Sequence, residues 1–91
     1  MLNELEVMVL NNLIDRYLEV RDRYFDLLDD TDSVELLLWV THEKGEAMGR
    51  IDGVLKMIEM RLGTTVELNW DMAVDDNIRK ITIAGYNEQF I

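Results

Sequence analysis

Apolar residues follow a helical period over the first third of the chain. At 100° per residue they fill a broad arc of about 200° between Asn3 and Asp29, and the opposite arc is polar. One packing partner needs an apolar stripe of only ~100°. The pattern therefore predicts a first helix over about residues 3–29 that contacts more than one other element. The arc consists of Leu2, Leu5, Val9, Leu10, Leu13, Ile14, Tyr17, Val20, Tyr24, Phe25, Leu27 and Leu28.

A second helical period follows a short polar break and predicts a helix over about residues 33–62. Asp32 or Ser33 can cap its start, and Gly63 is suited to end it. Because the connection is short, we expect the two helices to form an antiparallel hairpin. The run from Leu36 to Val40 is apolar all round, which predicts burial on more than one side. The face expected to pack inward consists of Leu37, Thr41, Met48, Ile51, Leu55, Ile58 and Leu62.

After Gly63 the period changes from helical to alternating. Val66, Leu68 and Trp70 alternate with polar residues, and β-branched residues dominate positions 78–83. These segments predict a β-hairpin over about residues 64–84, joined by Asp71–Asn77. Two strands alone are only marginally stable, so they must pack on the helices or pair with another chain. The predicted fold is α+β: a long antiparallel helical hairpin followed by a C-terminal β-hairpin. The tail 85–91 is not assigned, although Tyr86, Phe90 and Ile91 can cover apolar surface.

Composition indicates one small, acidic domain spanning residues 1–91. The chain has 48% hydrophobic residues, no cysteine and a net charge of −10. Residues 1–35 hold ten acids and three bases, a net charge of −7. Direct binding of DNA or RNA needs clustered Lys and Arg and is disfavoured, whereas a basic partner is the electrostatic complement. Without a basic N-terminal leader or a membrane-spanning apolar run, a cytoplasmic location is expected and a membrane partner is not.

Three glycines spaced four residues apart, Gly45, Gly49 and Gly53, interrupt the second predicted helix. Each costs a helix interior about 1 kcal/mol relative to alanine, so the stripe indicates a close approach of other atoms. The stripe is a candidate oligomer seam or ligand groove. Packing within the chain by the β-hairpin strands, or by Tyr86 and Phe90, is the alternative. Sharing its side of the helix are Leu38, His42, Lys56 and Met60.

A row of carboxylates lines one face of the first predicted helix at alternating spacings of four and three residues. Such neighbours lie about 5–6 Å apart, comparable to successive phosphates of a nucleic-acid strand. The row can therefore imitate a nucleic-acid backbone toward a basic partner. The alternative is that the row has no binding role and is an ordinary solvated face that keeps the protein soluble. The row consists of Asp15, Glu19, Asp22, Asp26 and Asp29.

Catalytic motifs are missing from the sequence. His42 is the single histidine, and zinc catalysis normally needs three protein ligands. Glu43 and Glu46 have the spacing of a magnesium-binding pair. The second acidic pair that all-α nucleotide pyrophosphatases place downstream is absent, because Leu62 follows Glu59 at the matching position. We therefore expect a protein that is not an enzyme and carries no metal or cofactor.

These features favour a small binding protein that occludes or sequesters a partner. Size and charge suit an inhibitor, for example a phage-encoded protein that blocks a bacterial defence or nucleic-acid-processing protein. One alternative is an oligomer that binds a small, nucleotide-like molecule at a subunit seam near the glycine stripe. Another is a purely structural subunit. Self-association is expected in each case, because both predicted helices have more apolar circumference than one partner covers.

Overall fold

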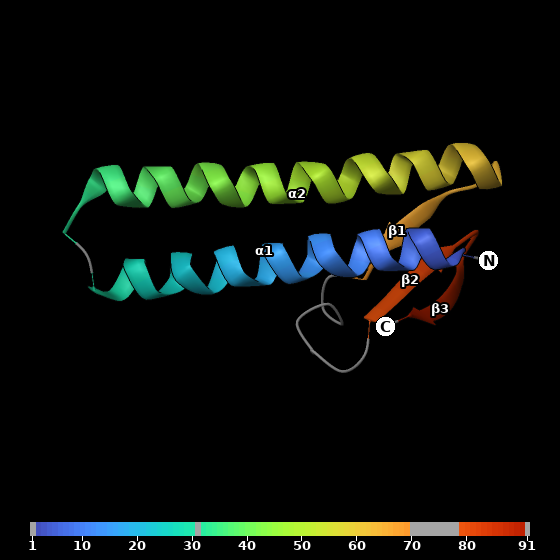
Figure 1. Cartoon of the computed structure of the whole chain (residues 1–91), viewed down its shortest axis with the longest axis horizontal. Helices are drawn as coiled ribbons and strands as arrows, with labels where there is room; N and C mark the ends of the chain where they lie inside the picture. Colours follow the sequence, from blue (N-terminus) through green and yellow to red (C-terminus); the bar gives the residue numbers. More distant parts are fainter. Residues whose placement is uncertain (1, 31, 70–78, 91) are drawn as a thin grey trace.

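The computed structural model is a long helical hairpin with a small sheet packed against one end (Figure 1). It describes residues 2–30, 32–69 and 79–90. Helix α1 spans Glu4–Asp30 and helix α2 spans Val34–Leu62, and they run antiparallel. The predicted helical hairpin is confirmed, and its predicted boundaries differ from the observed ones by a single residue.

Local capping interactions fix the helix ends. The Asn3 N–H donates to Glu6 Oε1 at 2.9 Å, and the Glu6 N–H donates to Asn3 Oδ1 at 2.8 Å. This is a reciprocal capping box. At the start of α2, the Leu36 N–H donates to the Ser33 hydroxyl. Gly63 ends α2 at a φ of 70°, with its N–H donating to the Glu59 carbonyl at 2.7 Å.

The C-terminal part forms an antiparallel sheet with three described strands in the order β1-β2-β3. Strand β1 is Val66–Leu68, β2 is Arg79–Ile83 and β3 is Tyr86–Phe90. The α+β layout is confirmed, and β3 adds a strand that the sequence did not assign. Ala84 and Gly85 link β2 to β3 with φ angles of 53° and 84°, as a two-residue hairpin turn requires. The predicted connection 71–77 lies outside the described residues.

The hydrophobic core lies where the sheet meets both helices. Strand β1 alternates as predicted, with Val66 and Leu68 buried and Glu67 exposed. The Val66 N–H donates to Glu59 Oε1 at 3.0 Å, which holds β1 against α2. Helix α1 thus contacts both α2 and the sheet, as its wide apolar arc predicts. The buried cluster consists of Leu10, Ile14, Leu18, Ile51, Leu55, Ile58, Val66, Leu68, Ile81 and Ile83.

The inward side of each helix differs in part from the predicted one. Thr41 is exposed and donates its hydroxyl proton to the Leu37 carbonyl, whereas Val40 and Ala47 are buried. Around residues 40–47 of α2 the described strands do not reach the hairpin (Figure 1). The buried side of α2 is there the side that faces α1. Leu18 is buried although the predicted arc omits it, because it contributes to the cluster beneath the sheet.

The predicted burial of the Leu36–Val40 run is wrong for the isolated chain. Val40 is buried, but Leu36, Leu38 and Trp39 are 51%, 64% and 62% exposed. This end of the hairpin extends beyond the described strands (Figure 1), so nothing in the described part of the chain covers its outer sides. Other apolar side chains that remain exposed include Leu5, Phe25, Leu28, Val34, Met57, Met60 and Tyr86.

Candidate functional site

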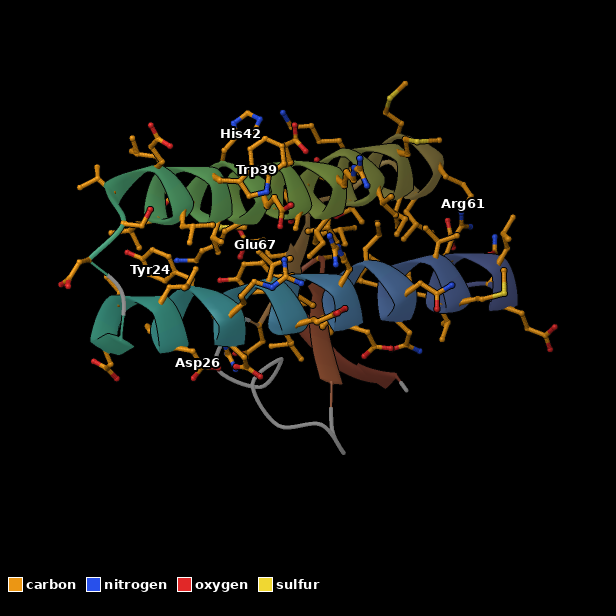
Figure 2. The ribbon with its side chains drawn as sticks, turned by 60° about the vertical axis from the view of Figure 1, so that its left-hand side comes forward. Tyr24, Asp26, Trp39, His42, Arg61 and Glu67 are labelled. Carbon is orange, nitrogen blue, oxygen red and sulfur yellow. The ribbon has the colours of Figure 1, made fainter. Side chains whose placement is uncertain are left out.

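The predicted carboxylate row forms the outer edge of α1, on the side away from α2. All five members, Asp15, Glu19, Asp22, Asp26 and Asp29, are exposed, and Asp26 points away from the hairpin in Figure 2. Two of them meet arginines on the same helix, Glu19 with Arg16 at 3.6 Å and Asp22 with Arg21 at 3.2 Å. Within the described residues, Asp26 and Asp29 form no ion pair. The structure therefore presents the row to solvent. Its negative charge is least compensated near Asp26 and Asp29, at the end of the hairpin where α1 ends and α2 begins, which we call the hairpin tip.

Exposed apolar side chains lie next to this end of the row. Phe25 is 52% exposed and follows Asp22 by three positions, so the two are neighbours on the surface of α1. Leu28 is 47% exposed and follows Phe25 by three positions, which extends this apolar area away from the row. Phe25 packs against Tyr24 with 5.7 Å between ring centroids, and the Lys44 ammonium lies 4.7 Å from the Tyr24 ring centroid. These contacts hold the Tyr24 ring between the helices (Figure 2). The hairpin tip thus combines apolar area with carboxylates.

The predicted glycine stripe lies open on the outer side of α2. A Cβ added at Gly45, Gly49 or Gly53 would have no described atom within 4 Å apart from its own helix. Packing within the chain is therefore ruled out for the described residues, and Tyr86, offered as a cover, is 79% exposed. Phe90, the other suggested cover, has no described side chain. Leu38, His42 and Met60 are exposed as well, so the seam or groove stays a prediction.

His42 lies on the outer side of α2 (Figure 2), and its Nε2 is 3.0 Å from Glu46 Oε1. Glu43, the other member of the candidate magnesium pair, turns toward α1 and pairs with Arg23 at 3.2 Å. The two carboxylates therefore have different partners, His42 on α2 and Arg23 on α1. In the described ranges, no three acidic or histidine side chains are arranged to hold a metal ion.

The sequence did not predict one surface feature, an apolar groove of about 400 Å³ between the start of α1 and the end of α2. Leu5 and Val9 line it from α1, and Val54 and Met57 from α2. The sequence placed Leu5 and Val9 in one broad apolar arc without showing which part of the arc the sheet covers. The sheet covers the side that carries Leu10 and Ile14, which leaves this side of the hairpin open.

An ion pair closes the end of the groove and ties the two helices together. Arg61 Nε donates to Glu6 Oε2 at 2.8 Å, and Arg61 Nη2 donates to Glu6 Oε1 at 2.5 Å. This bidentate contact holds the pKa of the Glu6 carboxyl below its ordinary value and raises the pKa of Arg61. Arg61 lies between the helices in Figure 2.

Glu6 should make folding pH-dependent in acid. Because its pKa is lower in the folded state, the unfolded chain binds more protons below the ordinary value of 4.5. The stability from this pair is therefore complete above that value and is lost as the pH falls through the folded pKa. Urea unfolding between pH 6 and 3 should show a steeper loss for the wild type than for Glu6→Gln. Arg61→Gln should flatten the profile in part, because the Asn3 N–H still donates to Glu6. An unchanged slope in both variants would contradict this role.

Comparison with known proteins gives no family: no family model, no curated protein and no solved structure matches the chain. Neither α1 nor α2 is apolar enough along its described length to cross a membrane. Function is therefore inferred from the surfaces described above.

Proposed function

We propose that the protein binds a partner with a basic surface along the outer edge of α1, and acts by occluding that partner rather than by catalysis. The observation that supports this most directly is the exposed carboxylate row from Asp15 to Asp29. Like charges three or four residues apart repel by a few tenths of a kcal/mol per pair. A basic partner would relieve this repulsion.

The tip of the hairpin gives this surface an apolar component. Protein interfaces commonly place apolar and aromatic side chains at the centre and polar residues at the rim. Phe25 would supply the centre, and Asp22 and Asp29, which flank it on the surface of α1, the rim. A partner with a nucleic-acid-binding surface fits this chemistry, because the row resembles a line of phosphates. A phage-encoded inhibitor of a bacterial defence or nucleic-acid-processing protein, acting in the cytoplasm, is the specific form we propose.

Self-association is a second proposed property, and the exposed apolar side chains of α2 favour it. Val34, Leu36, Leu38, Trp39, Met57 and Met60 are all more than half exposed. Large exposed apolar surface on a small domain is typical of an interaction site. Two sides of α2 are available, the glycine stripe and the side opposite the sheet.

The partner-binding proposal is tested by neutralising the row in one variant, Asp15→Asn, Glu19→Gln, Asp22→Asn and Asp26→Asn together. The wild-type protein is used to capture partners from its native cells, and binding of each captured protein is measured against both forms. We expect the variant to stay folded, because these side chains face solvent, and to associate at least about tenfold more slowly at low salt. Raising the salt from 0.1 M to 1 M should slow wild-type association, since the Debye length falls from ~10 Å to ~3 Å.

A charge-matched control separates the effect of the row on binding from the effect of the overall net charge. Neutralising four exposed carboxylates elsewhere, Asp32, Glu35, Asp52 and Glu67, changes the net charge by the same amount. This control should bind nearly as fast as the wild type. Equal binding by wild type and row variant at low salt would show that the row is only a solvated face.

A further inference from the structure

The side of the hairpin opposite the sheet is self-complementary, and we propose that a second copy of the chain docks there in antiparallel orientation. We call this side the open face. It contains Leu5, Val9 and Arg16 of α1, and Trp39, Glu46, Arg50, Val54 and Met57 of α2. The proposal rests on the self-association proposed above and assigns it to one surface.

An apolar groove occupies one end of the open face. Its walls are Leu5 and Val9 on α1 and Val54 and Met57 on α2, and Leu5 and Met57 are 63% and 69% exposed. The charged groups at its end, Glu6 and Arg61, already satisfy each other through two hydrogen bonds. The groove therefore offers apolar area with no charge left unpaired at its end, which suits an aromatic side chain.

Trp39 supplies an aromatic side chain at the other end of the same face. Met57 follows Trp39 by eighteen residues, which is five full helical turns, so both project from the same side of α2 about 27 Å apart. The indole is 62% exposed in the isolated chain. Tryptophan, with tyrosine and arginine, is enriched among the residues that dominate binding energy at interfaces. In an antiparallel pair, Trp39 of each copy would enter the groove of the other.

The charged residues between the groove and Trp39 favour the same antiparallel register. A small pocket of about 100 Å³ at the middle of the face is lined by Arg16, Glu43, Glu46 and Arg50, together with Leu13 and Ala47. Trp39 and Met57 have their midpoint at residue 48, and so do Glu46 and Arg50. A two-fold axis at that level brings Trp39 onto Met57 and Glu46 onto Arg50 of the other copy, twice in each case. A parallel arrangement would place like charges together instead.

The area of the open face is sufficient for a stable dimer. Helix α2 has 29 residues, so the face is ~43 Å long, and two helices side by side are ~20 Å wide. This is about the 800 Å² per partner that specific interfaces bury. The glycine stripe belongs to one helix only and offers about half as much. Area and charge therefore both favour the open face over the stripe.

Two matched pairs of substitutions test which side of α2 forms the interface. Trp39→Ala and Met57→Ala alter the open face, whereas Leu38→Ala and Met60→Ala alter the glycine side. All four side chains are more than 60% exposed, so the monomer fold should tolerate each substitution, with helix content by circular dichroism as the check. Sedimentation equilibrium should give a wild-type mass twice the 10.7 kDa of one chain. Trp39→Ala and Met57→Ala should raise the dimer dissociation constant at least tenfold, and the other two less than threefold.

A charge exchange tests the antiparallel register. Glu46→Arg alone, or Arg50→Glu alone, places like charges opposite each other twice in the homodimer, so each variant should dimerise at least tenfold more weakly. Mixing the two variants should restore wild-type affinity, because every facing pair then has opposite charges. In a parallel dimer, residue 46 would face residue 46 and residue 50 would face residue 50. Each single variant would then dimerise about as well as the wild type, because all three have like charges in both facing pairs, and the mixture would bind more tightly than the wild type.

Each remaining outcome overturns the proposal in a recognisable way. If Leu38→Ala and Met60→Ala weaken the dimer while Trp39→Ala and Met57→Ala do not, self-association stands but belongs to the glycine side. A wild-type mass of one chain at all concentrations would remove self-association altogether. A mass that grows beyond the dimer with concentration would rule out a closed two-fold pair.

Discussion

Replacing Gly45, Gly49 and Gly53 together by alanine should raise the free energy of unfolding by about 2–3 kcal/mol. Each glycine lies inside α2, where alanine is about 1 kcal/mol more favourable. No described atom outside the local helix lies within 4 Å of the added methyl groups, so the gain should not be offset by a clash. For a domain of this size the melting temperature should rise by about 10–20 °C. Urea unfolding at sub-micromolar protein concentration measures the gain without a contribution from association.

Gly63 provides the matched control for this experiment. It has equally open surroundings but a φ of +70°, in the left-handed region that an L residue adopts at a cost of about 1–2 kcal/mol. Gly63→Ala should therefore destabilise the protein, although the chemical change is the same. If the triple variant were also destabilised, and increasingly so at higher protein concentration, the stripe would have a neighbour that the isolated chain does not contain. That result would support the glycine seam.

Replacing Ile14 by alanine should lower the free energy of unfolding by about 2–5 kcal/mol. Ile14 is completely buried and belongs to the cluster in which α1, α2, β1 and β2 meet. Shortening it removes buried methyl groups and leaves a cavity that its neighbours on three elements can fill only in part. Domains of this kind have only about 5–15 kcal/mol of stability in total, so the loss is a large fraction. Chemical denaturation monitored by circular dichroism measures it.

Met8 on the same helix is the control for Ile14, because its side chain is 54% exposed. Met8→Ala should change stability by no more than about 0.5 kcal/mol. A similar loss in both variants would mean that the side of α1 facing the sheet is not the principal core. A loss under 1 kcal/mol for Ile14→Ala would contradict the packing described for that position.

The helix boundaries could be predicted from the sequence, because they depend on contacts between near neighbours. The capping box of Asn3 and Glu6, the Ser33 cap and the Gly63 terminator each act within one turn. The alternation of Val66 and Leu68 around Glu67 is equally local and identified β1. The row from Asp15 to Asp29 could also be recognised, since a helical period is enough to place its members on one edge.

Which sides of those helices are covered could not be predicted in the same way, because it depends on tertiary packing. Leu36, Leu38 and Trp39 are as apolar as Val40, yet the chain buries only Val40, because the described strands end short of the hairpin tip. The glycine stripe is open because it lies on the outer side of α2, and the groove of Leu5 and Met57 is exposed because the sheet lies on the opposite side of the hairpin. Burial depends on where a distant segment packs, and the period of a helix carries no information about that position.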